Sequence, residues 1–287
     1  MSESNATLMP GALRERFWTA LMLALATVGA VLWLPTAVLA IAMMPVVALS
    51  VWELTLLLGL TRVWWRWAYV CGVLAVVGSS GVAGVPTQSL PILLPFLLPV
   101  ALFWLLTAVL IFRVGDVCAA KAVDWWLLPM AIPVVLACWV GLLALHALPD
   151  GGPWMVLFVL MLVWLADTGA YFAGRRFGRR KLAPNVSPGK TVEGVIGGLL
   201  AAALWSLTLI PVAEGALSWL WLALLCVLTA VVSVAGDLLE SWLKRRRNLK
   251  DAGSLLPGHG GMLDRVDSLF AAVPVFALGF LLWEAIN

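Results

Sequence analysis

The run LSWLWLALLCVLTAVVSVAGDLLES occupies residues 217–241 and is followed directly by WLKRRRNLKDAGSLLPGHGGMLDRVD at residues 242–267. The first stretch is apolar and long enough to cross a bilayer, which takes roughly 20 residues of helix. The second is rich in cations, carboxylates and glycine, and it contains a histidine. This abrupt change predicts a membrane-spanning helix that ends in a polar segment at one membrane surface.

The rest of the chain has the same apolar character. Of its 287 residues, 63% are hydrophobic and only 11% are charged, and the mean hydropathy is +1.04. Soluble domains carry about 25% charged residues. Backbone groups in lipid must be paired internally, which leaves helices or a closed barrel, and the apolar runs lack the alternation of barrel strands. We therefore expect an all-α integral membrane protein, a polytopic helical bundle.

The apolar runs predict about nine transmembrane helices, of which the third is the weakest because Gly78-Ser79-Ser80-Gly81 interrupts it. The runs lie near residues 17–34, 36–60, 67–85, 90–112, 125–148, 153–174, 191–213, 217–241 and 268–286.

The basic residues give the orientation of these spans. With nine spans, all 18 Lys and Arg residues fall on one face of the membrane. Cytoplasmic loops carry the excess of Lys and Arg, so the N-terminus is predicted to be cytoplasmic and the C-terminus external. The first apolar run is longer than the 7–15-residue core of a signal peptide, so we expect it to be a retained span.

The two halves of the chain differ in polarity. Residues 1–150 carry almost no intramembrane charge apart from Glu53, whereas polar groups concentrate from Asp167 onward. We interpret residues 1–150 as an N-terminal transmembrane scaffold whose apolar surface would support a homodimer. Residues 151–287 are interpreted as the catalytic region. The four cysteines are scattered without a Cys-x-x-Cys pair, so we expect packing residues and no zinc or redox motif.

Two polar segments precede the one quoted above. Asp167 and Tyr171 share a helix face near the end of a span, where an ionised carboxylate costs at least about 2.5 kcal/mol. The carboxylate would line a polar cavity or, alternatively, pair with an arginine. Ser187-Pro-Gly-Lys190-Thr191 is predicted to be a loop entering a helix, where free amide groups favour an anion and Lys190 adds charge. Flanking charge plus an ordinary cap is the alternative.

In the quoted stretch, Asp237, Glu240, Ser241 and Lys244 share one helical face. Mg²⁺ prefers carboxylates and phosphate oxygens and takes few protein ligands. We predict Asp237 and Asp264 as magnesium ligands, since the Gly260-Gly261 turn would bring Asp264 back toward the helix. Whether a second cation binds beside magnesium stays open, because residue spacing does not decide it. For the surplus arginines, Arg246 and Arg247, the simpler interpretation is stop-transfer charge or charge facing lipid headgroups.

The stretch resembles the signature of the phosphatidate cytidylyltransferases, also called CDP-diacylglycerol synthases. The matching residues are Ser241, Lys244, Arg245, Lys250, Asp251, Pro257, His259, Gly260, Gly261, Asp264, Arg265 and Asp267. The segments around Asp167 and Lys190 are similar to other blocks of that family. Gly189 stands where the family commonly has a second lysine, which puts the role of a paired lysine in doubt. The match covers roughly residues 160–270.

The resemblance implies that CTP and phosphatidic acid react to give CDP-diacylglycerol and pyrophosphate. It implies a bacterial-type inner membrane protein with many spans and an active site on the cytoplasmic face. The magnesium ligands would be Asp237 and Asp264, supported by Glu240 or Asp267. His259 would bond a phosphate oxygen or protonate the leaving pyrophosphate. The groups expected to bind substrate are Asp167, Ser187, Lys190, Thr191, Lys244, Arg245, Lys250 and Arg265.

Other functions remain open from the residues alone. A lipid kinase, or a nucleotidyltransferase acting on another lipid phosphate or alcohol, would need a similar polar site. A transporter would carry intramembrane carboxylates, but the polar residues gather on one face, which disfavours a path across the membrane. The Asp-x2-Asp-Gly-x2-Ala-Arg pattern of CDP-alcohol phosphotransferases is absent from the sequence. We expect no nucleic-acid partner.

Overall fold

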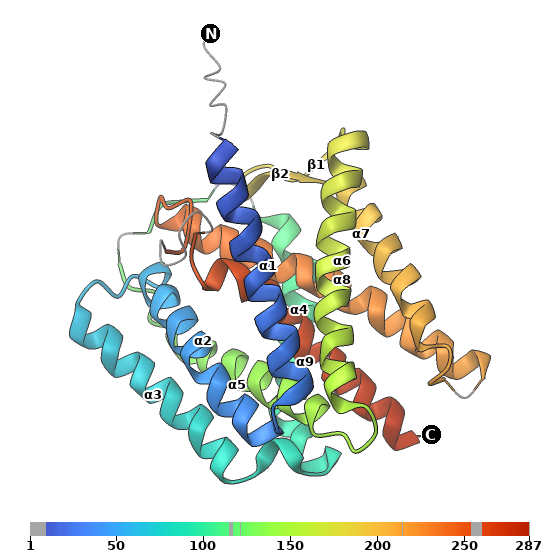
Figure 1. Ribbon diagram of the computed structural model, residues 1–287. Coiled ribbons are helices and arrows are strands. Elements are labelled where there is room, and N and C mark those ends of the chain that lie inside the picture. Colours follow the sequence, from blue (N-terminus) through green and yellow to red (C-terminus); the bar gives the residue numbers. More distant parts are fainter. Residues whose placement is uncertain (1–9, 115–116, 121, 214, 254–259, 287) are drawn as a thin grey trace.

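The computed structural model describes residues 10–114, 117–120, 122–213, 215–253 and 260–286. Nine α-helices within these ranges correspond one by one to the predicted apolar runs (Figure 1). They are α1 (Pro10–Trp33), α2 (Thr36–Leu57), α3 (Val63–Val82), α4 (Leu90–Leu110), α5 (Leu127–His146), α6 (Gly152–Phe177), α7 (Val192–Ser206), α8 (Ala216–Arg246) and α9 (Leu263–Ile286). Three short 3-10 turns connect them: η1 (Val85–Thr87), η2 (Ile111–Arg113) and η3 (Leu207–Leu209).

Seven of the helical segments in the described residues are long and apolar enough to cross a membrane. They lie in α2, α4, α5, α6, α7, α8 and α9, whereas the apolar part of α1 is shorter, at Leu21–Trp33. The helix outside both groups is α3, the one with the Gly78–Gly81 interruption. The predicted polytopic all-α membrane protein is confirmed, and the orientation of its termini stays a prediction.

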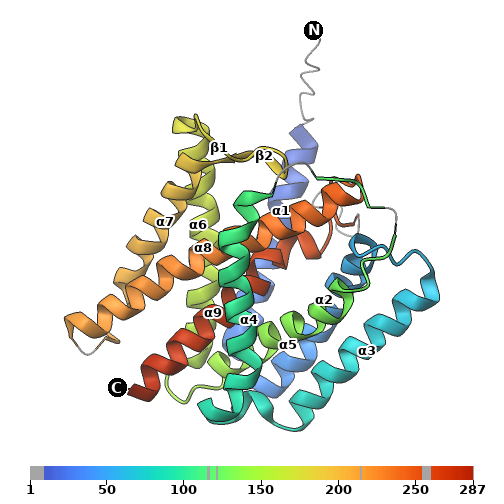
Figure 2. The same ribbon diagram turned by 180° about the vertical axis from the view of Figure 1, so that it is seen from behind.

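The polar segments gather at one end of the bundle. The beginning of α1 and the end of α9 lie toward opposite ends of the molecule, and the strands lie at the same end as the beginning of α1 (Figures 1 and 2). The C-terminal end of α8 and the beginning of α9 are also near this end. An odd number of spans separates the beginning of α1 from the end of α9 in this way. Exposed tryptophans begin α3 and precede α5, as expected of residues at a membrane interface: Trp64, Trp65, Trp67, Trp125 and Trp126.

Helices α6 and α7 pack closely because small residues line their contact. A Cβ atom at Gly194 would lie 2.9 Å from the Ala170 carbonyl oxygen, and one at Gly198 would lie 2.8 Å from that of Ala166. Gly197 faces Gly169 in the same way. Backbones that approach this closely bring the end of α6 beside the segment that enters α7.

The segment before α7 differs from the prediction. It is a short antiparallel hairpin of β1 (Lys181–Ala183) and β2 (Ser187–Thr191), not an irregular loop. Thr191 then caps α7, since its hydroxyl oxygen accepts a hydrogen bond from the Gly194 amide at 3.1 Å. Five residues with proline and glycine give too weak an alternation to predict a strand, and the pairing with β1 decides it.

Helix α9 lies in the centre of the fold and packs against α8, α5 and α4. Its middle is fully buried at Ala271, Ala272, Val273 and Phe276. At its beginning α9 crosses α8 at Gly236, where a Cβ atom would lie 2.9 Å from the Asp267 carbonyl oxygen. The absence of a side chain at Gly236 thus sets the acids of α8 and α9 next to each other. Of the cysteines, Cys138 and Cys226 are buried packing residues as predicted, whereas Cys71 and Cys118 are exposed.

Candidate active site

A polar cavity of about 400 Å³ lies where α6, the β2–α7 segment and α8 meet. Asp167 and Tyr171 of α6 line it, together with Lys190 and Thr191 of the hairpin and Asp237 of α8. The three segments singled out in the sequence therefore converge on one space. Asp167 has no arginine within ion-pair distance among the described residues, so the cavity-lining interpretation holds and the arginine-pair alternative does not.

Lys190 and Asp237 connect two of these segments directly. The Lys190 ammonium lies 2.5 Å from a carboxylate oxygen of Asp237, and both side chains are partly exposed to the cavity. The Ser241 hydroxyl donates to the other Asp237 oxygen at 3.3 Å. Lys190 therefore contacts an acid in the same cavity, a contact that the interpretation as flanking charge does not explain. A phosphate bound at Lys190 would lie beside the Asp237 carboxylate.

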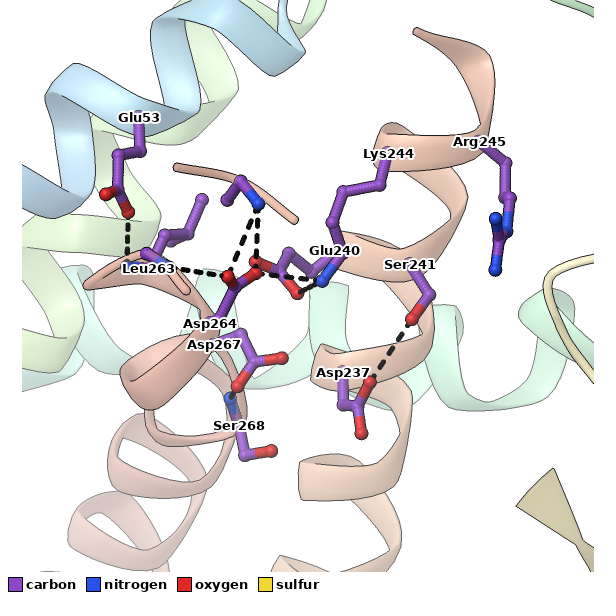
Figure 3. A network of polar contacts seen from close by, with 12 residues as sticks. Glu53, Asp237, Glu240, Ser241, Lys244, Arg245, Leu263, Asp264, Asp267 and Ser268 are labelled. Atoms are coloured by element: carbon purple, nitrogen blue, oxygen red, sulfur yellow. Dashed lines mark hydrogen bonds and ion pairs between the residues drawn. The ribbon is translucent and has the colours of Figure 1, made fainter. Parts of the chain in front are cut away.

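A second ionic network lies at the crossing of α8 and α9 (Figure 3). The Lys244 ammonium bonds to Glu240 at 2.5 Å and to Asp264 at 2.9 Å, and all three side chains are largely buried. Asp264 also accepts hydrogen bonds from the backbone amides of Ala252 and Gly261, at 3.2 and 2.8 Å. Asp264 thereby joins the two ends of the glycine-rich turn to α8, as the sequence predicted for this turn.

Asp267 lies next to both groups. Its carboxylate is close enough to those of Asp237 and Glu240 to interact with them electrostatically, while Asp167 is repelled by Asp237 and attracted by Lys190. We call the five acids the carboxylate cluster: Asp167, Asp237, Glu240, Asp264 and Asp267. Lys190 and Lys244 form ion pairs within this cluster.

The carboxylate cluster fits a divalent cation. The five carboxyl groups outnumber the two ammonium groups that pair with them, and the Oε1 atom of Glu240 is buried without a hydrogen-bond partner among the described residues. No group of three or more His, Cys, Asp or Glu side chains is arranged to hold a metal by itself in the described part of the chain. A Mg²⁺ ion bound here would therefore take one or two of these carboxylates and would need substrate phosphates to complete its coordination.

Two features of the cavity wall were not assigned from the sequence. Arg175 lines the cavity, and its guanidinium donates to the Tyr171 hydroxyl at 3.0 Å. The spacing of Asp167, Tyr171 and Arg175 at four-residue intervals could have indicated this shared face. Gly189 also lines the cavity, and a Cβ atom there would meet nothing within 4 Å. A lysine side chain at that position would have room, whereas here Lys190 and Arg175 are the cations that line the cavity.

The interpretation of Arg246 and Arg247 as charges facing lipid headgroups is wrong. Arg247 donates to the Leu57 carbonyl at 2.8 Å and to those of Ala120 and Ala122 at 2.7 and 2.9 Å, and its Nη2 bonds to Asp124 at 2.6 Å. Its side chain is only 8% exposed.

Arg246 bonds to the second oxygen of the same Asp124 carboxylate at 2.6 Å and lies over the Trp242 ring. The two arginines and Asp124, which we call the arginine clamp, thus hold the end of α8 against α2 and against the segment before α5. Asp124 was not singled out in the sequence because its partners lie more than a hundred residues away.

Glu53 is the second acid from the first half that reaches this region. It is 2% exposed, and its Oε2 atom accepts a hydrogen bond from the Leu263 amide at 2.7 Å (Figure 3). A Cβ atom at Gly253 or Gly261 would collide with the Glu53 carboxylate. Glu53 therefore caps α9 and packs against both sides of the glycine-rich turn. Its isolated charge in an apolar run was the signal that could have revealed it.

The remaining predicted residues lie around this centre. Ser187 pairs with Ala183 in the hairpin and does not line the cavity. Arg245 is exposed beside the hairpin, with its Nε 3.4 Å from the Val186 carbonyl. Lys250 and Arg265 are exposed at the same end. The role predicted for His259 lies outside the described residues, and the division of the chain at residue 150 stays a prediction.

Comparison with known proteins agrees with the sequence resemblance. A model of the cytidylyltransferase family matches residues 14–283. The phosphatidate cytidylyltransferase of Pseudomonas aeruginosa is 41% identical over 275 residues, which are 95% of this chain and 98% of that protein. Those of Haemophilus influenzae and Bacillus subtilis are 51% and 39% identical over 133 and 137 residues, about half of each chain. This chain belongs to the cytidylyltransferase family.

Proposed function

We propose that this protein is a membrane-embedded phosphatidate cytidylyltransferase, which converts CTP and phosphatidic acid to CDP-diacylglycerol and pyrophosphate. The observation that supports it most is the polar cavity between α6, β2 and α8, with its paired Lys190 and Asp237. A relative of that name matches nearly the whole chain. The apolar helices are long enough to cross a membrane, so a protein with this cavity would also contact its lipid substrate.

In the proposed reaction a phosphate oxygen of phosphatidate attacks the α-phosphorus of CTP. A new P–O bond forms there, the bond from the α-phosphorus to the bridging oxygen breaks, and pyrophosphate leaves with the electron pair. The nucleophile is already anionic, so no serine or cysteine has to be activated. The task of the protein is to bring two polyanions together, by positioning them and neutralising their charge.

The described residues suit this task. Lys190 and Arg175 would bind phosphates in the polar cavity, and Lys244 would do so at the α8–α9 crossing. Asp237 and Asp264 would hold Mg²⁺, with Glu240 or Asp267 in support. When bound, the ion would neutralise charge on the triphosphate. Asp167 would orient Lys190, with which it interacts electrostatically. A second cation and a homodimer are also part of this proposal, although no contact among the described residues supports either of them.

The direct test is pyrophosphate release by purified protein in detergent micelles. We expect release with CTP, Mg²⁺ and phosphatidate together, no release without phosphatidate, and loss of release in EDTA that returns when Mg²⁺ is added. Replacing CTP by ATP decides between this function and a lipid kinase. Phosphorylation of a lipid alcohol by ATP, without pyrophosphate, would contradict the proposal. Full activity in EDTA would remove the metal from it.

The cavity is proposed to face the cytoplasm of a bacterial inner membrane. The native Cys118 offers a test of this orientation, because it is exposed. It lies two residues before Ala120, which the arginine clamp binds, in the segment before α5. In a Cys71→Ser background, we expect a membrane-impermeant maleimide to label Cys118 in inverted vesicles and not in intact spheroplasts. The Cys118→Ser variant is the control for background labelling. Labelling in spheroplasts would reverse the orientation.

A further inference from the structure

A second cavity, of about 100 Å³, lies on another side of α8 and differs in character from the polar one. It is bounded by α2, α4, α5, α8 and α9, and its wall is almost wholly apolar. The charged residues among its lining are Glu240 and Asp267, which belong to the carboxylate cluster. Both cavities therefore adjoin the carboxylate cluster. The apolar cavity meets it at Glu240 and Asp267, and the polar cavity meets it at Asp237.

The apolar cavity also reaches the outside of the bundle. Met130 of α5 lines it and is 48% exposed, on a helix apolar enough to cross the membrane. A flexible chain in the bilayer could enter between α4 and α5 at this level. A cavity of roughly 150 Å³ holds a molecule of benzene, so this one would hold a few methylene groups of a chain, with the rest remaining in lipid.

One wall residue offers a hydrogen bond. Trp104 of α4 is 3% exposed, and its indole N–H has no acceptor among the described residues. Tryptophan is a donor only, and a buried indole N–H usually finds a partner. The matching ligand group is an uncharged oxygen acceptor close to an apolar chain, as in a carboxylic ester.

We propose that the apolar cavity seats the first methylene groups of one acyl chain of the lipid substrate, with its ester carbonyl accepting the Trp104 N–H. This rests on the proposed function, which makes phosphatidate a substrate. The cavity would add little affinity, because a chain in lipid is already in apolar surroundings. Its effect is positional: a seated chain fixes where the phosphate lies beside Glu240 and Asp267, and small misplacements of a reacting group are costly.

Substrates with and without the carbonyl test the hydrogen bond. We expect the protein to use diester phosphatidate with a kcat/KM about 3- to 10-fold above that of the diether analogue, the range of one hydrogen bond. Trp104→Phe should remove this preference. Trp139→Phe is the matched control, because Trp139 is equally buried with an unpartnered N–H but does not line the cavity. An unchanged ester preference in Trp104→Phe would overturn the assignment.

Filling the cavity tests the position of the chain. Ala131 lines the cavity on α5, and we expect Ala131→Phe to lower kcat/KM for phosphatidate at least about tenfold while KM for CTP stays within twofold. Ala42→Phe, an exposed position on α2 outside the cavity, should leave both unchanged. An Ala131→Phe variant with normal use of phosphatidate would contradict the proposal.

Cross-linking separates a failure of this inference from a failure of the proposed function, because it needs no turnover. A phosphatidate with a diazirine near the ester should label α4 and α5 at the cavity. Unlabelled phosphatidate should compete, and phosphatidylcholine should not. Equal competition by phosphatidylcholine would mean that any membrane lipid fills the cavity, which overturns the inference. If no lipid tested as a substrate gave pyrophosphate release, that result would contradict the proposed function alone.

Discussion

Asp237→Asn is expected to lower kcat for pyrophosphate release by at least about 10²-fold, the scale of losing one preorganised electrostatic group in an active site. Asn keeps the size of the side chain but removes the charge that would hold Mg²⁺ beside Lys190. The stability should change little, because the Asp237 side chain is 34% exposed and such partly exposed ion pairs contribute about 0.2–1 kcal/mol. Steady-state kinetics and the thermal midpoint Tm in the same detergent measure both.

The control for this change is Asp150→Asn, which removes an exposed carboxylate between α5 and α6, outside the carboxylate cluster. It should keep full activity and the same Tm. A kcat within twofold of the unmodified protein in Asp237→Asn would contradict the role proposed for Asp237.

Asp264→Asn separates binding of a metal from support of the turn. It should also lose activity, but with a lower Tm, because both Asp264 oxygens accept hydrogen bonds from the backbone at Ala252 or Gly261. An Asn amide offers only one acceptor in place of the two oxygens. Full activity in Asp264→Asn would show that the metal lies elsewhere.

Arg247→Ala is expected to destabilise the protein by about 3 kcal/mol, near the range for breaking a buried ion pair. The guanidinium satisfies three carbonyl oxygens and one oxygen of Asp124, and it is almost entirely buried. Its removal leaves these acceptors without their donor, although Arg246 still pairs with Asp124. At about 2–4 °C per kcal/mol, Tm in detergent should fall by roughly 6–12 °C.

A double-mutant cycle tests the arginine clamp itself. Asp124→Ala should cost a similar amount, and the combined Arg247→Ala/Asp124→Ala variant should cost less than the sum, since the two residues share one interaction. Arg179→Ala, which removes an exposed cation at the end of α6, should change stability by no more than about 0.5 kcal/mol. Additive costs at Arg247 and Asp124 would mean that the two do not stabilise the fold as a pair.

The helices of this protein could be predicted because each apolar run is long enough to form one by itself. In lipid the backbone has almost no alternative to a helix. Each of the nine predicted runs therefore corresponds to one of the nine helices of the described residues, with ends that differ by several residues. The hairpin before α7 was missed for the opposite reason. Strand pairing depends on the partner segment, and Ser187–Thr191 has no strong preference of its own.

Part of the candidate site could also be predicted from residues that lie close together in the sequence. The face shared by Asp237, Glu240 and Lys244 follows from helical spacing alone, and the return of Asp264 follows from a short glycine turn. Arg247 shows where this reasoning stops. Its charge and position beside a span fit a headgroup contact, yet its partners come from the end of α2 and from the segment before α5.

The sequence by itself determined the membrane class, the approximate positions of the helices and the chemistry gathered between residues 241 and 267, because these depend on composition and on spacing within one helix. Only the tertiary structure decided which acids meet. Lys190 pairs with Asp237, Glu53 caps α9, and Asp124 binds two arginines. Each of these contacts joins residues far apart in the chain. Their distances are set by how α2, α6, α8 and α9 pack, which no local pattern encodes.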